Sequence, residues 1–552
     1  MGFSLKFRLV DHIHTNRLLT ALNLVAGVSI LFFGYDQGMM AGVNNTPYYA
    51  TRMDFGYGND EGGVVVTNST RQGGIVAIYY LGTLFGAIAG GYLGDKLGRV
   101  KSIAVGAAWA ILGASLQCSA MNVAWMCCAR VINGCGTGIL NAVVPVYSAE
   151  TAEYKSRGMF IAFEFTLNIL GVVVAYWLEY GLSYVNGGYS DIRWRLPIGF
   201  QIAPLLVLFA AIWVFPESPR WLIKNGQNDE ALYILQRLRG TETNEAEEEY
   251  QDICHIIELE KHNSKLNSYW NMFFGIGSGD LHLGRRVQLV IWLQILQEWI
   301  GIAGITVYAP TIFANAGFDS NKSNWLSGLN NIFYMFATII NAFTVDRFGR
   351  RMTLYWGAIA QGIAMFLAGG FSRAQINNPD NTAWGAASAS FIFIYTSVFG
   401  ATWLVVPWLY PTEVFPLQVR ARGNAFGVIG WSIGNGWLTL LCPIMFNHIG
   451  EKTLYIFGAF NVVSLPIVYC FYPETAKRTL EEVDFLFAAK TPWAWDAEKE
   501  FKRLSDEDRI ARANEGISGA KAHEMDKLRG AEAGLNGDAS SSESVLNAPN
   551  KD

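Results

Sequence analysis

The chain has 552 residues, of which 51% are hydrophobic and 16% are charged. Because soluble proteins carry about a quarter charged residues, this composition excludes an ordinary soluble domain. The formal net charge of −5 is spread along the chain, which argues against a nucleic-acid partner. The seven cysteines show no metal-ligand spacing, so we expect neither a metal site nor another cofactor.

Long apolar stretches follow one another along the chain. A helix that rises about 1.5 Å per residue needs about 20 residues to cross about 30 Å of hydrocarbon. The stretches lie at 18–43, 73–93, 102–119, 124–147, 159–179, 196–215, 288–314, 326–345, 353–370, 385–410, 424–447 and 453–472. They predict an all-α membrane protein with 12 transmembrane helices.

Lys and Arg residues gather in the loops on one side of these predicted helices. The segment before the first helix carries Lys6, Arg8 and Arg17, and most of the other basic residues lie in the even-numbered connections. Because basic loops remain in the cytoplasm, both termini are predicted to be cytoplasmic. We expect an integral protein of the plasma membrane that contacts lipid and is a monomer.

The loop sequences repeat in the two halves of the chain. The corresponding positions are Asp95 and Asp346, Arg99 and Arg350, Glu150 and Glu413, Arg157 and Arg420, and Pro216 and Pro473. Their separations are nearly equal, which indicates two pseudo-symmetric six-helix bundles. The predicted parts are a cytoplasmic N-terminus (1–17), a first bundle (18–215), cytoplasmic linker helices (216–287), a second bundle (288–472) and a cytoplasmic tail (473–552), disordered from about 530.

The repeated charges predict ion pairs at the cytoplasmic end of the bundles. Each loop places a carboxylate at a helix end beside arginines of a neighbouring loop, and such pairs can form when that end closes and break when it opens. The alternative is a static surface ion pair that also signals topology. The predicted cytoplasmic gate residues are Asp95, Arg99, Glu150, Arg157, Asp346, Arg350, Glu413 and Arg420.

These loops, together with three glycines after Arg130, resemble the sugar porter branch of the major facilitator superfamily over about residues 18–485. The stretches Phe33–Gly38 and Leu404–Pro411 look most like fungal sugar and polyol symporters. The resemblance implies the major facilitator fold and alternating access around a central site. The sequence has no nucleophile–base motif and no phosphate-binding glycine loop, so we do not expect an enzyme.

Asp36 lies inside the first apolar stretch, where an ionised carboxylate is costly unless it is paired. Counted from the outer helix ends, Asp36 and Arg130 both lie about 10 Å deep, so they are predicted to pair. Protonation of Asp36 would release Arg130, and the resemblance associates an aspartate at this place with proton symport. The alternative is a permanent structural ion pair in a uniporter.

The resemblance also implies substrate-binding residues by their position. Amide side chains bind hydroxyl groups and an aromatic ring covers the apolar face of a sugar, so such a set suits a sugar or polyol. The predicted residues are Phe33, Gln297, Glu298, Tyr308, Trp408 and Asn435. Glu298 departs from the family glutamine, and we interpret it either as a neutral carboxylic acid in place of glutamine or as a second coupling group.

Three further positions depart from the family pattern, because Phe165, Ala303 and Tyr334 stand where amides are expected. The substrate is therefore predicted to be less hydroxylated than glucose, such as a deoxysugar or small polyol, or to bind in another pose. The sequence predicts a secondary active transporter that imports a monosaccharide or related polyol with a proton. The alternatives are a facilitative sugar uniporter and a nutrient sensor that does not transport.

Overall fold

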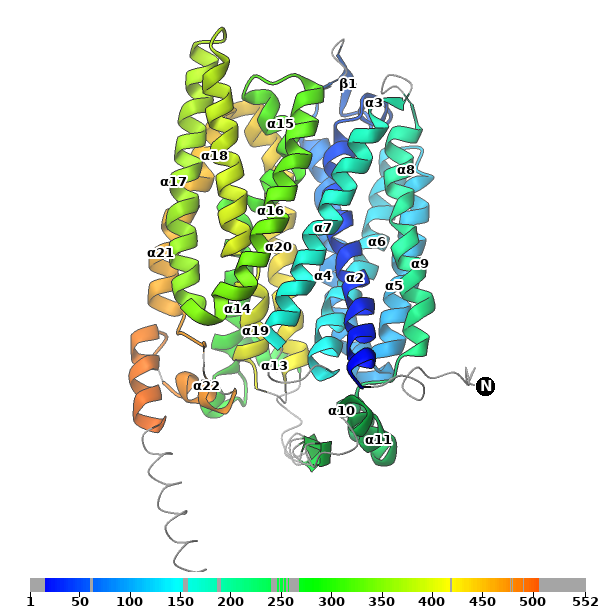
Figure 1. Cartoon of the computed structure of the whole chain (residues 1–552), viewed down its shortest axis with the longest axis vertical. Coiled ribbons are helices and arrows are strands. Elements are labelled where there is room, and N and C mark those ends of the chain that lie inside the picture. The colour runs from blue at the N-terminus through cyan, green and yellow to red at the C-terminus, as the bar shows by residue number, and fades with distance from the viewer. Residues whose placement is uncertain are drawn as a thin grey trace, which may run out of the picture.

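The computed structural model describes residues 15–59, 63–151, 157–185, 190–239, parts of 246–257, 268–416, 419–476, 478, 480–489 and 491–505. Within these residues, 12 helical spans are long and apolar enough to cross a membrane. They run side by side along the long axis of the molecule (Figure 1). The prediction of an all-α protein with 12 membrane spans is confirmed.

The first half of the bundle consists of six spans. Five are single helices, and the sixth is divided into three consecutive helical segments that include Pro197. The spans are α2 (Thr15–Asn44), α4 (Ser69–Leu97), α5 (Arg99–Cys118), α6 (Val123–Thr151), α7 (Arg157–Leu182) and the run α8 (Ile192–Phe200), α9 (Ile202–Ala211) and η3 (Ile212–Val214).

The second half repeats this arrangement, but its first and fourth spans are interrupted. The spans are the run α14 (Leu283–Gln297), η6 (Glu298–Ile302) and α15 (Ala303–Asn315), then α16 (Ser320–Phe348), α17 (Arg350–Asn377), the pair α18 (Thr382–Ala401) and α19 (Val406–Val414), α20 (Arg420–Ile449) and α21 (Lys452–Phe471). Irregular backbone at membrane depth is tolerated where it is buried in protein or lines a cavity.

The interruption of the seventh span follows from its sequence. η6 is a single π-helical turn in which Gly301 has φ 119°. A Cβ at this position would lie 2.8 Å from the ring of Phe457, so both the conformation and the close packing require glycine. Such π-helical turns are frequent at functional sites.

Most of the helices are longer than the apolar stretches that predicted them. The second span was predicted at 73–93 and occupies Ser69–Leu97. An apolar window marks only the hydrocarbon-spanning part, whereas the helical hydrogen bonds continue into the polar region on both sides.

The two halves pack along two seams, with α4 against α20 and α7 against α16. In the first seam the hydroxyls of Thr83 and Ser432 are 2.7 Å apart. Within the first half, Gly82 of α4 and Gly134 of α6 allow close approach, because a Cβ on either would collide with the backbone of the other helix. The cavity described below lies between these seams.

The two ends of the bundle differ. We call one the hairpin end, where α3 (Pro47–Arg52) and the antiparallel pair β1 (Gly56–Gly58) and β2 (Val64–Val66) lie. The other, the linker end, carries α10 (Pro219–Lys224), α11 (Asn228–Arg239), α13 (Tyr269–Phe274), η5 (Gly279–Leu281) and α22 (Leu480–Phe487). A further helical stretch covers 494–505. The tail predicted to be disordered from about 530 lies outside the described residues.

Candidate functional site

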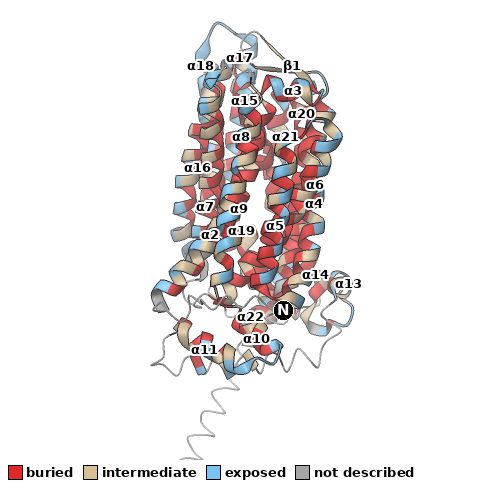
Figure 2. Ribbon diagram, turned by 90° about the vertical axis from the view of Figure 1, so that its right-hand side faces the viewer, coloured by how far each residue is buried: buried red, intermediate tan, exposed pale blue. Residues whose placement is uncertain are grey.

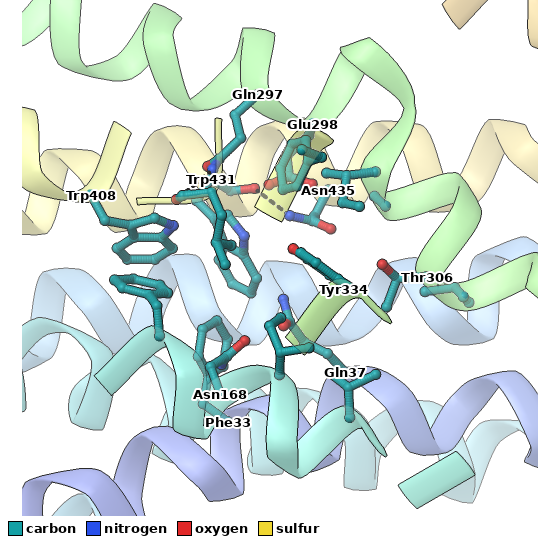
Figure 3. Close-up of a pocket in the computed structure, with 18 of the residues that line it drawn as sticks. Phe33, Gln37, Asn168, Gln297, Glu298, Thr306, Tyr334, Trp408, Trp431 and Asn435 are labelled. Atoms are coloured by element: carbon teal, nitrogen blue, oxygen red, sulfur yellow. Dashed lines mark hydrogen bonds between the residues drawn. The ribbon is translucent and has the colours of Figure 1, made fainter. Parts of the chain in front are cut away.

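A cavity of about 510 Å³ lies between the two halves of the bundle. Side chains of both halves face each other across it (Figure 3). Its wall is formed by Phe33, Gln37, Tyr80, Phe165, Asn168, Ile169, Val172, Gln297, Glu298, Ile302, Ala303, Thr306, Val307, Tyr334, Phe399, Leu404, Trp408, Trp431 and Asn435.

Aromatic rings from the two halves meet at this cavity. Phe33 of α2 lies edge-on to Trp431 of α20, with ring centroids 5.1 Å apart, and 6.2 Å from Trp408 of α19. Tyr80 lies 5.3 Å from Trp431, and Phe165 lies 5.5 Å from Trp408. Flat apolar faces of this kind match the apolar face of a small ring-shaped or polyhydroxylated ligand.

Three polar residues of the cavity wall, Gln297, Glu298 and Thr306, come from the interrupted seventh span. Gln297 is the last residue of α14, and its Nε2 donates to the carbonyl oxygens of Trp403 (2.8 Å) and Leu404 (3.0 Å), where the tenth span is broken. Its Oε1 has no hydrogen-bond partner among the described residues. Gln297 therefore joins the two interrupted spans and leaves one acceptor available to a hydroxyl group.

Glu298 begins the π-helical turn and is 4% exposed. It is the only charged residue among the described residues that line the cavity. Asn435 lies near it, with its Nδ2 3.4 Å from the carbonyl oxygen of Trp431 (Figure 3). A carboxyl group and an amide on one wall can both donate and accept hydrogen bonds when the carboxyl is protonated.

The structure brings five of the six predicted substrate-binding residues to the cavity wall: Phe33, Gln297, Glu298, Trp408 and Asn435. Tyr308 does not line it, because its hydroxyl donates to the carbonyl oxygen of Thr439 (3.0 Å) and joins α15 to α20. All three positions that depart from the family amides, Phe165, Ala303 and Tyr334, line the cavity.

Sequence reasoning did not single out Gln37, Tyr80 and Thr306, which also line the cavity. Gln37 directly follows Asp36 inside an apolar helix, and this polar pair was an available signal. Tyr80 and Thr306 are ordinary residues of apolar helices, and no motif marks them.

Asp36 and Arg130 are 2% and 1% exposed, and neither is among the described residues that line the cavity. The charge of Arg130 acts on Asp36, but no ion pair joins the two within the described structure. Neither carboxylate oxygen of Asp36 has a hydrogen bond of good geometry there, although the Tyr79 side chain interacts with it, and the Arg130 guanidinium stands 5.0 Å from the ring centre of Tyr79. Its Nη2 donates to the carbonyl oxygen of Val76 at 3.3 Å.

Most of the predicted gate residues at the linker end form ion pairs inside one half rather than between the halves. Arg99 binds Glu150 through two hydrogen bonds of 2.9 Å, and Arg350 binds Glu413 at 3.1 and 2.5 Å. Each arginine also lies near the aspartate four residues before it, Asp95 at 3.7 Å or Asp346 at 2.9 Å. These contacts hold neighbouring spans of one half together.

A second carboxylate strengthens each of these clusters. Glu217 accepts from the backbone N–H of Arg99 at 2.7 Å, and Glu474 accepts from that of Arg350 at 2.9 Å. They cap the N-termini of α5 and α17, where carboxylates are stabilised by the helix dipole. Ser218 and Thr475 then donate to Glu150 (2.6 Å) and Glu413 (2.7 Å).

The pair that joins the halves at the linker end is Asp95 with Arg422, whose Nη2 lies 3.0 Å from Oδ2. The predicted Arg420 lies two residues earlier, and its Nε donates to the carbonyl oxygen of Phe415 (3.4 Å) in its own half. The side chain of Arg157 lies outside the described residues.

Contacts between the halves also occur at the hairpin end. The hydroxyl of Tyr176 on α7 donates to the carbonyl oxygen of Thr306 on α15. Asn45 donates to Asn324 at 3.3 Å, and Asn447 to Ser69 at 2.6 Å. The cavity therefore has cross-half contacts on both sides.

The family model described as sugar (and other) transporter matches residues 22–487. The chain belongs to the sugar porter branch of the major facilitator superfamily. It is therefore a membrane transporter and not an enzyme.

Two related proteins and one solved structure show how similar this chain is to known transporters. This sugar porter is 32% identical over 466 residues to the MFS-type transporter oryC of Aspergillus oryzae, covering 84% of each chain. It is 30% identical to the sugar transporter STL1 of Saccharomyces cerevisiae, covering 83% of this chain and 79% of that one. The proton:xylose symporter XylE bound to 6-bromo-6-deoxy-D-glucose has the same fold, with a TM-score of 0.72 at 24% identity over 86% of this chain and 100% of XylE.

Proposed function

We propose that this sugar porter imports a monosaccharide or related polyol together with a proton. The observation that carries the proposal is the cavity between the halves, with aromatic faces, amides and one carboxyl group on its wall. Two similar proteins support it, because STL1 is a sugar transporter and XylE is a proton:xylose symporter.

We infer that the substrate has fewer hydroxyl groups than glucose. Phe165, Ala303 and Tyr334 supply no amide to the cavity, and both Nε2 hydrogens of Gln297 are directed to the backbone of the tenth span. Each missing amide removes hydrogen-bond donors and acceptors that a hydroxyl group would need on leaving water. A deoxysugar or small polyol meets this condition better than glucose.

Asp36 is proposed to bind the transported proton. A buried carboxylate without a hydrogen-bond partner is costly, so Asp36 is inferred to be protonated in the closed conformation described here. On proton loss it would form an ion pair with Arg130. One proton that crosses about 100 mV supplies about 2.3 kcal/mol, which sustains a substrate gradient of about fortyfold.

The proposed cycle alternates between opening of the two ends. Asp95–Arg422 closes the linker end and Tyr176–Thr306 closes the hairpin end, so each must break once per cycle. The linker end and both chain termini are proposed to face the cytoplasm, in a plasma-membrane protein that works as a monomer.

The test is uptake of labelled sugars and polyols by cells that lack their own sugar carriers, with and without a protonophore. We expect accumulation of at least one deoxysugar or small polyol, and loss of accumulation with the protonophore. The Asp36→Asn variant should equilibrate the substrate without accumulating it. Asp319→Asn, which keeps the capping oxygen of α16, is the matched control and should accumulate normally.

Three other outcomes would contradict parts of the proposal. Uptake that only equilibrates in the wild type and ignores the protonophore would identify a uniporter. Preference for glucose over all other sugars would overturn the inference about hydroxyl groups. Expression at the membrane without uptake of any member of the panel would favour a nutrient sensor.

A further inference from the structure

A short helix at the linker end presents an apolar face that the proposed transport cycle does not use. In α13, Trp270 is 67% exposed and Phe274 is 55% exposed, and Ile276 just after the helix is 53% exposed. Figure 2 shows α13 at the side of the bundle beside the start of α14. Exposed aromatic side chains at the end of a transmembrane bundle are typical of the membrane–water interface.

An open groove lies between α13 and the first turns of α14. The chain reverses direction here with Gly275 in the left-handed region (φ 67°), and a Cβ on Gly284 would lie 3.0 Å from the Gly275 nitrogen. Its wall includes Phe273, Phe274, Ser278, His282, Arg285 and Gln288. The groove therefore combines an aromatic side with polar and basic groups, and no acidic residue is among the described residues that line it.

Arg285 is a basic group of this groove that has no acidic partner among the described residues. Its Nη2 donates to the carbonyl oxygen of Pro492 at 3.0 Å, and its guanidinium stands 5.4 Å from the ring centre of Phe487. Its Nε and Nη1 are buried and have no hydrogen-bond partner within the described structure. The next residue, Arg286, shows the contrast, because it binds Asp484 at 2.7 Å and is fully buried. Arg285 thus places a positive charge, with no carboxylate beside it within the described structure, next to an apolar surface at the end of a membrane span.

We propose that this groove binds an anionic glycerophospholipid of the leaflet at the linker end. The phosphate would lie at Arg285 and His282, and an acyl chain would cover Phe274 and Trp270. Charge complementarity supports a phosphate, and the adjacent apolar face supports a lipid rather than a free anion. A soluble phosphate would leave the aromatic side chains exposed.

The position of α13 connects this site to the contact between the halves. Tyr269, its first residue, packs on Phe426 of α20 with ring centroids 5.5 Å apart, and Arg422 stands 5.9 Å from its ring centre. A Cβ on Gly91 of α4 would collide with the Tyr269 hydroxyl, so Tyr269 touches both halves. A lipid that holds α13 in place therefore stabilises the closed linker end.

The experiment uses the purified full-length protein in vesicles of phosphatidylcholine with or without phosphatidylserine. Mass spectrometry of the extracted protein counts the phospholipids that stay bound. We expect phosphatidylserine adducts in the wild type and about fivefold fewer in Arg285→Gln, because one basic side chain near an anionic lipid is worth about 1 kcal/mol. Arg285→Lys should restore them.

Arg503→Gln is the control, because it removes one positive charge from an exposed part of the same end. It should retain phosphatidylserine as the wild type does. Equal retention by the wild type and Arg285→Gln, or equal adducts of the two lipids in the wild type, overturns the proposal. A further variant is truncated after residue 505. If it binds phosphatidylserine and the full chain binds none, the chain's own tail fills the groove and the proposal is overturned. These readouts need no substrate, so they are independent of the proposed transport function.

Discussion

Glu298 is the residue at which this cavity departs most from an uncharged sugar site. It begins the π-helical turn beside the amide of Asn435 and is 4% exposed, with no basic residue on the described cavity wall to balance an ionised carboxylate. A neutral carboxylic acid at this place would donate one hydrogen bond and accept another, as a glutamine does.

Replacing Glu298 therefore distinguishes its two interpretations. Glu298→Gln preserves a donor and an acceptor, so accumulation should continue with KM within about threefold of the wild type. Glu298→Ala removes both, and we expect KM to rise about tenfold, the equivalent of about one hydrogen bond. Initial-rate uptake of the best substrate measures both values. Loss of accumulation in Glu298→Gln alone would instead make Glu298 a second coupling group.

At the scale of single residues, the sequence predicted the functional residues that lie in a motif. It missed those whose role depends on which way a helix turns its side chains. Gln297, Trp408 and Asn435 line the cavity as expected. Arg420 was predicted at the gate, but Arg422 joins the halves. Side chains two positions apart on a helix point about 200° apart, so these two arginines face nearly opposite sides. A loop motif fixes the approximate position of a charge but not this rotation.

At the scale of elements, apolar length predicted the spans but not their interruptions. The seventh and tenth spans contain prolines and glycines, as many membrane helices do, and only the structure shows where the backbone departs from the α-helix. Gly301 carries the departure in the seventh span, with φ 119° and Phe457 directly against it. Neither the φ value nor the distant contact is encoded in a local pattern.

Gly301→Ala should therefore destabilise the protein and distort the cavity. We expect a loss of about 2 kcal/mol from the strained backbone, a clear fall in apparent Tm and a weaker substrate-dependent rise in Tm. Thermal unfolding of the detergent-purified protein measures these effects. Gly74→Ala in α4 is the control, because a Cβ there meets no atom within 4 Å. An equal Tm for Gly301→Ala and the wild type would contradict this account.

At the scale of the whole molecule, the contacts between the two halves, along the seams and at both ends, determine which conformations the transporter can adopt. The ion pairs predicted for the gate mostly lie within one half. They therefore hold the helices of that half together while the two halves move relative to each other. The ion pair that opposes opening at the linker end, among the described residues, is Asp95–Arg422, whose side chains are 20% and 23% exposed. A pair this exposed contributes about 0.5 to 1 kcal/mol, which shifts a two-state population by about two- to fivefold.

Arg422→Gln should consequently favour opening at the linker end. The reporter is a single cysteine in place of Asn168 on the cavity wall, in a protein whose native cysteines are replaced. In this protein, Arg422→Gln should make labelling of the cysteine from the linker side about two- to fivefold faster. Arg478→Gln breaks a pair with Glu498 at the same end within the second half, so it should leave the labelling rate unchanged. A similar acceleration by both variants would show that general loosening, not the cross-half pair, is responsible.

The duplicated cluster of a capping carboxylate, an arginine and a second carboxylate has one more consequence. Each half contains its own complete set of these bonds, and α11 packs with the first half while α13 packs against α14 and α20. Neither half then needs the covalent connection between residues 257 and 268 to complete its own contacts. Co-expressed fragments 1–257 and 268–552 should meet again in the bilayer and restore uptake, at a level limited by how often they find each other.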